Sequence, residues 1–153
     1  MTDYRPEGFS DVSAYLIIDG AAQALDFYTA VFGAETRVRM DGPGGTVGHA
    51  EIAIGDSLLM VADEDPAFDA RGPRSVGGSP VTLCLYVKDV DAVVESAVAR
   101  GATVVRPVED KFYGDRAGLI EDPFGHRWNV ATHVEEVSPE EMERRIAALM
   151  SEG

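Results

Sequence analysis

The sequence predicts an α+β fold in which two β-α-β-β-β repeats form a curved mixed sheet around a central cavity, followed by a C-terminal helix. The first observation behind this prediction is order, because a strand-like run, a helix-like segment and three more strand-like runs occur twice. The second observation is spacing, since Asp89 follows Asp19 by 70 residues and Gly125 follows Gly55 by the same interval. The same 70-residue interval near the start and near the end of the repeat indicates that the unit is duplicated.

The first repeat is predicted over residues 12–62. The run SAYLII at 13–18 is typical of a strand, and AAQALDFYTAVF after it places apolar residues at helical spacing. Gly33 follows where a helix needs a left-handed C-terminal cap. Three strands are then expected, in AETRVRM, in TVGHAEIAI after the turn DGPGG, and in SLLMVA after the tight turn Gly55–Asp56.

The second repeat is predicted over residues 81–132, after a Pro-, Gly-, Asp- and Ser-rich linker at 63–80. Its strands are expected in VTLCLYV, ATVVRPV, YGDRAGLIE and RWNVAT, and its helix in DVDAVVESAVARG. A further helix is predicted over 138–151, with Ser138 as N-cap, Pro139 at the first helical position and Glu141 completing a capping box. All of these elements are assigned to one domain spanning 1–153.

Composition excludes several classes of partner. The 153 residues carry 27 acidic against 13 basic side chains, a formal net charge of −14, so phosphate backbones and anionic lipid are repelled. We therefore expect neither a nucleic-acid nor a membrane partner. The N-terminal MTDYRPEGFSDVS lacks a basic-then-apolar signal pattern, and the only cysteine is Cys84, so a reducing, cytoplasmic location is predicted.

Four segments carry a family resemblance: YLIIDGAAQALDFYTAVFGAE, HAEIAIGDSLLMVADE, LYVKDVDAVVESAVARGATVVRPVED and FYGDRAGLIEDPFGHRWNVATH. They resemble the vicinal oxygen chelate superfamily, which comprises glyoxalases, bleomycin-resistance proteins and extradiol dioxygenases, and within it a PhnB-like, glyoxalase-related branch. The resemblance covers residues 12–135. It implies the doubled fold, a small-molecule cavity and a homodimer, but it leaves the function open among isomerases, transferases, dioxygenases and drug-binding proteins.

The resemblance also implies four inward positions at which metal-using members place His, Glu or Gln. Counting from the strand-end Asp and the hairpin Gly of each repeat assigns these positions to Val12, Leu59, Thr82 and Asn129. A divalent metal needs three or four converging N, O or S donors, which these four side chains do not supply. We therefore predict no metal at this site and no cofactor.

His49 and Glu51 are the alternative candidates for chemistry. Two residues apart on one predicted strand, they share a face, where they could bind a displaced metal or act as a base and its partner. Arg116 could hold the charge that develops when such a base removes a proton next to a carbonyl. The simpler alternatives are that the pair flanks a wet cavity or meets another subunit, and that Arg116 bridges to a nearby carboxylate. His126 is expected to stabilise its turn, and His133 to lie exposed beyond the last strand.

The predicted ligand-binding residues are Thr82, Cys84, Tyr86, Tyr113, Arg116 and Asn129. Strand alternation places Thr82, Cys84 and Tyr86 on one face and adds Arg127 to the face of Asn129, whereas Trp128 should point into the helix layer. The loop KFYGDR brings aromatic surface next to a cation. For each residue alone, ordinary packing is the competing interpretation.

The sequence thus predicts a glyoxalase- or bleomycin-resistance-like protein that binds a small, partly apolar molecule without the usual metal. The alternative is a metal-dependent or metal-free lyase, isomerase or dioxygenase of the same superfamily that uses His49 and Glu51.

Overall fold

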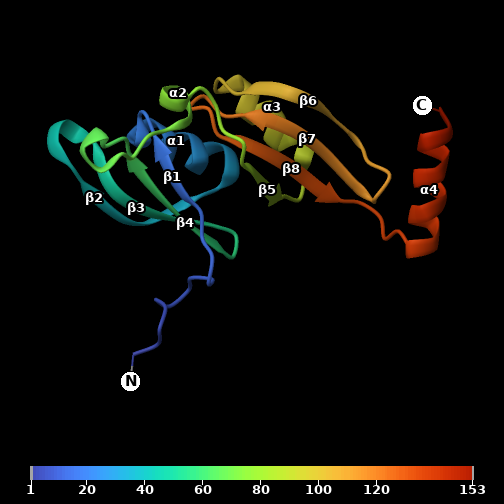
Figure 1. Cartoon of the computed structure of the whole chain (residues 1–153), viewed down its shortest axis with the longest axis horizontal. Coiled ribbons are helices and arrows are strands. Elements are labelled where there is room, and N and C mark those ends of the chain that lie inside the picture. The colour runs from blue at the N-terminus through green and yellow to red at the C-terminus, as the bar shows by residue number, and fades with distance from the viewer. Residues whose placement is uncertain (1, 153) are drawn as a thin grey trace. The chain divides into compact units, whose positions relative to one another are not determined.

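The computed structural model describes residues 2–152 and contains two compact units. One comprises the chain through Pro80 together with Pro123–His126, and the other comprises Val81–Asp122 with the chain from Arg127 onward. Each unit holds one β-α-β-β-β repeat, so the predicted α+β fold with two such repeats is confirmed (Figure 1). The extent of the single domain and its central cavity stay predictions.

The first unit is a four-stranded mixed sheet in the order β1-β4-β3-β2, with β1 parallel to β4 and the other pairs antiparallel. Its main elements are β1 (Tyr15–Ile18), α1 (Ala21–Phe32), β2 (Glu35–Asp41), β3 (Val47–Ile54) and β4 (Ser57–Asp63). Short helical turns occupy η1 (Pro43–Gly45), η2 (Pro66–Phe68) and α2 (Pro73–Val76). Helix α1 ends at Gly33 with φ 70°, which confirms the predicted left-handed cap.

The second unit repeats the plan in the order β5-β8-β7-β6, again with one parallel pair, β5 with β8. Its elements are β5 (Thr82–Tyr86), α3 (Val90–Ala99), β6 (Thr103–Asp110), β7 (Asp115–Glu121), β8 (Arg127–His133) and α4 (Pro139–Glu152). The amide of Glu141 donates to the Ser138 hydroxyl at 3.2 Å, as the capping box predicts. No residue of α4 is buried.

Each sheet buries the face that its helix covers. In the first unit, Ile18, Ile52 and Val61 pack against the buried side of α1. In the second unit, Val130 and Trp128 pack against α3. Trp128 is 2% exposed and donates its Nε1–H to Asp122 at 2.9 Å, so the predicted helix-side position is confirmed. The other face of each sheet carries most of the polar side chains that concern function.

The N-termini of α1 and α3 are each capped by a side chain from the last strand of the same repeat. Asp63 accepts hydrogen bonds from the amides of Gly20, Ala21 and Val47 at 3.1, 3.0 and 2.7 Å. Thr132 accepts from the amide of Val90 at 3.0 Å. These two caps are 69 residues apart, and so are the helix starts they serve.

The offset of 69 shows that the register predicted for the first repeat is wrong by one residue. Leu59 pairs with Ile52 and is buried on the helix side, while Val12 lies before β1 and is 88% exposed. The residues equivalent to Thr82 and Asn129 are Ser13 and Met60 instead. Met60 pairs with Glu51 and shares its face.

The hairpin between β7 and β8 explains the error at Leu59. The error at Val12 has another origin, because Asp89 is the N-cap of α3 and its equivalent in the first repeat is Gly20, not Asp19. The turn of the β7–β8 hairpin runs from Asp122 to His126, whereas Gly55 and Asp56 alone connect β3 to β4. Aligning the two turn glycines therefore misplaces the strands that follow. The tip of the longer turn belongs to the first unit, where the Nε2 of His126 lies 3.0 Å from the carbonyl oxygen of Ile17.

Candidate functional site

A hollow of about 500 Å³ lies on the face of the second sheet opposite α3. The volume falls within the range of ligand pockets. Its lining residues come from all four strands and from the β6–β7 loop: Thr82, Cys84, Arg106, Lys111, Tyr113, Gly118, Leu119, Arg127 and Asn129. Of the six predicted ligand-binding residues, the structure brings four to this hollow, namely Thr82, Cys84, Tyr113 and Asn129.

The floor of the hollow is a row of side chains that crosses the whole sheet. Cys84 pairs with Asn129, Asn129 with Leu119, and Leu119 with Arg106. Adjacent strands are about 4.8 Å apart, so four neighbouring positions present a continuous surface. The row combines a thiol, an amide, an aliphatic side chain and a guanidinium, which suits a ligand with both apolar and polar parts.

The close approach of edge strand β6 depends on Gly118. A Cβ atom at this position would lie 2.8 Å from Cγ2 of Val108 and 3.2 Å from its Cα, so only glycine leaves room for the neighbouring backbone. Strand β6 shifts register on both sides of Arg106 and contains Pro107, which an edge strand tolerates. These irregularities bring Arg106 to the hollow.

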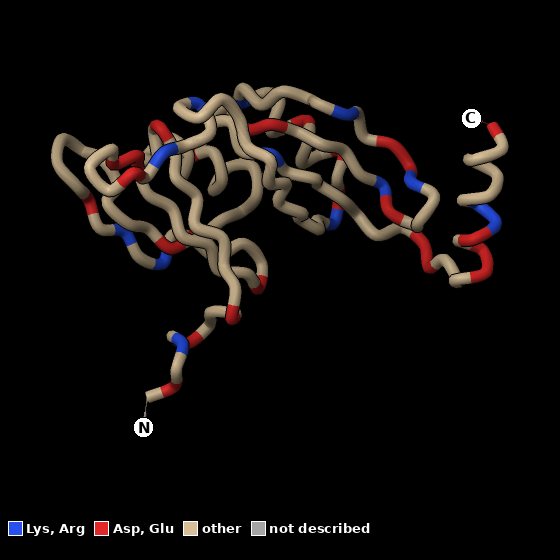
Figure 2. The backbone as a smooth tube through the Cα atoms, viewed as in Figure 1, with Lys and Arg blue, Asp and Glu red and all other residues tan. Residues whose placement is uncertain are grey.

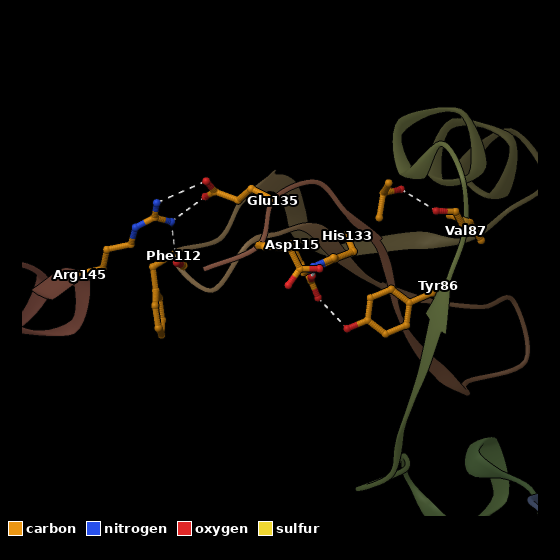
Figure 3. A network of polar contacts seen from close by, with 9 residues as sticks. Tyr86, Val87, Phe112, Asp115, His133, Glu135 and Arg145 are labelled. Atoms are coloured by element: carbon orange, nitrogen blue, oxygen red, sulfur yellow. Dashed lines mark hydrogen bonds and ion pairs between the residues drawn. The ribbon is translucent and has the colours of Figure 1, made fainter. Parts of the chain in front are cut away.

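Tyr86 lies outside the hollow's lining, and its hydroxyl donates to Asp115 at 2.7 Å (Figure 3). Asp115 is 5% exposed and also accepts from Nδ1 of His133 at 2.7 Å. The hydrogen bond to Asp115, and then burial, raise the pKa of Tyr86 above its usual value. His133 is the last residue of β8, so its predicted place beyond the strand is wrong, although it is exposed as expected.

Arg116 also lies outside the hollow's lining. Its guanidinium contacts both carboxylate oxygens of Asp91 on α3, at 2.8 and 3.0 Å, and Asp110 at 3.2 Å. The hydrogen bond to Asp91, followed by that to Asp110, shifts the pKa of Arg116 upward. The carboxylate bridge considered as an alternative for Arg116 is thus present in the structure.

His49 and Glu51 form a chain of hydrogen bonds with Tyr15 on the open face of the first sheet. Nε2 of His49 lies 2.9 Å from Oε2 of Glu51, and Nδ1 lies 2.8 Å from the hydroxyl oxygen of Tyr15. In the tautomer whose Nε2–H donates to the carboxylate, Nδ1 accepts a hydrogen bond from the Tyr15 hydroxyl. Burial, then the charge of Glu51, raise the pKa of Tyr15. Sequence reasoning missed Tyr15.

A second hollow of about 380 Å³ borders this chain in the first unit. Glu51, Met60 and Ser13 line it, together with part of the N-terminal segment. Ser13 and Met60 are the equivalents of Thr82 and Asn129 in the other hollow, so the same two sheet positions line a hollow in each repeat.

The donor set of these positions does not fit a divalent metal. With the register corrected, the first unit offers the Ser13 hydroxyl and the Met60 thioether, and the second unit offers the Thr82 hydroxyl and the Asn129 amide. None is a carboxylate, an imidazole or a thiolate. Elsewhere within residues 2–152, no three His, Cys, Asp or Glu side chains gather so as to hold a metal ion.

Doubled β-α-β-β-β units are typical of the vicinal oxygen chelate class of fold. Residues 12–130 match the Glyoxalase/Bleomycin resistance protein/Dioxygenase superfamily, and the chain belongs to this superfamily. No helix among the described residues has the length and apolar character to cross a membrane.

Relatives share the fold over most of the chain. An uncharacterized protein of Mycobacterium bovis is 41% identical over 145 residues, which is 93% of each chain. The crystal structure of TioX from Micromonospora sp. ML1 is similar with a TM-score of 0.63 and 28% identity, covering 82% of this chain and 99% of TioX. A structure described as a putative 3-demethylubiquinone-9 3-methyltransferase, PhnB protein, from Bacillus cereus has a TM-score of 0.62 at 21% identity, covering 80% of this chain and 99% of that one. At that identity the last comparison supports the fold alone.

Proposed function

We propose that this protein binds a small, partly apolar molecule in the hollow of its second unit, without a metal. The observation that carries the proposal is the row from Cys84 through Asn129 and Leu119, which presents thiol, amide and aliphatic surface beside Tyr113 in a hollow of about 500 Å³. Mixed linings of this kind are typical of ligand pockets. Superfamily membership agrees with this proposal, because the fold serves drug binders as well as enzymes.

The test is a thermal-shift screen of small aromatics, drugs and quinones, followed by titration of each hit. Binding to the native state raises the melting temperature as ligand concentration rises. Asn129→Trp should fill the hollow and abolish the shift. Met60→Trp, at the equivalent position of the other unit, is the matched control and should leave the shift intact. The reverse result, or no stabilisation by any class, contradicts the proposal.

A second candidate function is metal-free acid–base catalysis, favoured by the chain Tyr15–His49–Glu51. Glu51 orients the imidazole, and Nδ1 accepts the Tyr15 hydroxyl. A substrate carbonyl that takes over the Tyr15 hydrogen bond would leave Nδ1 free to accept a proton from the adjacent carbon. Such a pair could move a proton next to a substrate carbonyl. Arg116 is left out of this scheme, because Asp91 and Asp110 already occupy its guanidinium.

Deuterium exchange tests this candidate without requiring the natural substrate. NMR should show that the protein speeds exchange of the protons next to the carbonyl in simple ketones and aldehydes. His49→Gln should abolish the acceleration and Met60→Leu should preserve it. Exchange that is unaffected by His49→Gln removes the candidate.

We propose a cytoplasmic homodimer, with neither nucleic acid nor membrane as partner. The net charge of −14 supports the exclusions, and acidic positions recur along both units (Figure 2). Helix α4 supports self-association, because Ile146, Leu149 and Met150 on it are 39%, 51% and 77% exposed. Light scattering after size exclusion should give twice the chain mass, and Leu149→Glu should give a monomer. A monomeric wild-type protein contradicts the proposal.

A further inference from the structure

The hollow of the second unit is positively charged in a strongly acidic protein. Three of its nine lining residues are cationic, namely Arg106, Lys111 and Arg127, and none is acidic. Acidic side chains outnumber basic ones by 27 to 13 in the whole chain, so the lining reverses the general balance. A concave surface lined with one sign of charge concentrates ions of the opposite sign.

The duplicated fold provides an internal control. The hollow in the first unit has Asp11 and Glu51 in its lining against a single base, Arg5. Two hollows that share the equivalent sheet positions Met60 and Asn129 therefore carry opposite charge. The fold alone does not impose cations on this face, which indicates that the cationic lining is specific to the second repeat.

The three cations differ in how far carboxylates already neutralise them. Lys111 contacts Glu109 at 2.7 Å, and Arg127 contacts Glu121 through Nε alone at 3.4 Å. Arg106 has no ion-pair partner among residues 2–152. Lys111 and Arg127 thus retain donors that face no carboxylate, and Arg106 keeps its whole guanidinium available.

The geometry lets these cations act on one ligand. Arg127 stands on β8 and Arg106 on β6, with β7 between them. Strands two apart are separated by roughly 10 Å. Arg106 pairs with Leu119 and Arg127 with Glu121, so the two arginines are also offset by two residues, about 7 Å, along the strands. Two long arginine side chains that lean toward each other can span this diagonal and meet on one small anion beside Leu119. Arginine binds carboxylate and phosphate oxygens through paired N–H groups.

We infer that the ligand of this hollow is a small organic anion, with carboxylate or phosphate oxygens held by Arg106 and Arg127. Its apolar body lies against Leu119 and Tyr113. This inference rests on the proposed function and adds the chemical class of the ligand. It also replaces Arg116, the cation predicted from the sequence, with cations that line the hollow.

Isothermal titration calorimetry with matched probes tests the inference. Benzoate and phenyl phosphate carry the two kinds of anionic oxygen, and benzamide is the uncharged analogue of benzoate. We expect both anions to bind about tenfold more tightly than benzamide. The preference should weaken as salt is added, because exposed charges are screened. The relative affinities of the two anions distinguish carboxylate from phosphate recognition.

Three variants assign the effect to the hollow. Arg106→Gln should weaken anion binding about tenfold and leave benzamide unchanged, whereas Arg106→Lys should retain most of the affinity. Arg100→Gln, which removes an exposed cation outside the hollow's lining, should have no effect. Thermal unfolding of each variant confirms that the fold is intact.

The outcomes separate the two proposals. Equal affinity for benzoate and benzamide, or full anion binding by Arg106→Gln, overturns the anion inference while small-molecule binding stands. Binding of none of the three probes contradicts the proposed function together with the inference.

Discussion

Asp63 is expected to stabilise the first unit by holding the start of α1. Replacing it with alanine removes three hydrogen bonds, from the amides of Gly20, Ala21 and Val47. A hydrogen bond to a charged group contributes about 1.5–3 kcal/mol when well buried, and a neutral one about 1 kcal/mol. Because Asp63 is only partly buried and water can reach the freed amides, about 1 kcal/mol per bond is appropriate. The expected loss is about 3 kcal/mol.

Helix α1 has no local substitute for this carboxylate. Its N-cap residue is Gly20, which offers no side-chain acceptor, and no acidic residue occupies its first turn. Asp63→Asn keeps the shape of the side chain, but it turns an amide NH₂ toward one of the donors. We therefore expect an intermediate loss of about 2 kcal/mol.

Urea unfolding followed by circular dichroism measures these losses through the linear dependence of unfolding free energy on denaturant. Asp56→Ala, in the exposed turn between β3 and β4, is the matched control and should stay within about 0.5 kcal/mol of wild type. The reasoning is refuted if Asp63→Ala costs no more than Asp56→Ala, or if Asp63→Asn costs more than Asp63→Ala.

Three further predictions concern the second unit. Gly118→Ala should push edge strand β6 away and cost about 1–3 kcal/mol in urea unfolding; an unchanged midpoint contradicts the close approach seen here. Asp115, and then Glu136, raise the pKa of His133 above 6.5, so His133 should stabilise the fold fully below that pH and lose this contribution as pH rises through its higher folded pKa. Across this pH range the melting temperature should fall in wild type and not in His133→Asn. Melting temperatures that change equally with pH in both proteins argue against the interaction of His133 with Asp115 and Glu136. The thiol of Cys84 is exposed and lines the hollow, so iodoacetamide should alkylate it and a bound ligand should slow the reaction in mass spectrometry; labelling at equal rates places the ligand elsewhere.

Local signals in the sequence predict the fold well. Helical spacing, strand alternation and the glycine that ends α1 each depend on neighbouring residues, so both repeats can be recognised without coordinates. The register of the first repeat was missed, because Asp19 is not the equivalent of Asp89 and because the second position depends on the length of a turn. Gly55 and Gly125 look equivalent, but they stand in turns of different length, and this difference shifts Leu59 to the helix side.

The site could be predicted only where its residues lie on regular strands. Alternation brings Thr82, Cys84 and Asn129 to one face, and they line the hollow together. Arg106 was missed because β6 shifts register around it, which breaks the alternation. Tyr15 was missed because its partner His49 is 34 residues away, and the two meet only because β1 and β3 both pair with β4.

The central claim is that the hollow of the second unit is the ligand site. Amide NMR of the labelled protein during titration with benzoate tests it most directly. Shifts confined to the hollow, at Thr82, Leu119, Asn129 and their neighbours, are the predicted result. Shifts gathered around His49 and Met60 would place the ligand in the first unit and contradict the account.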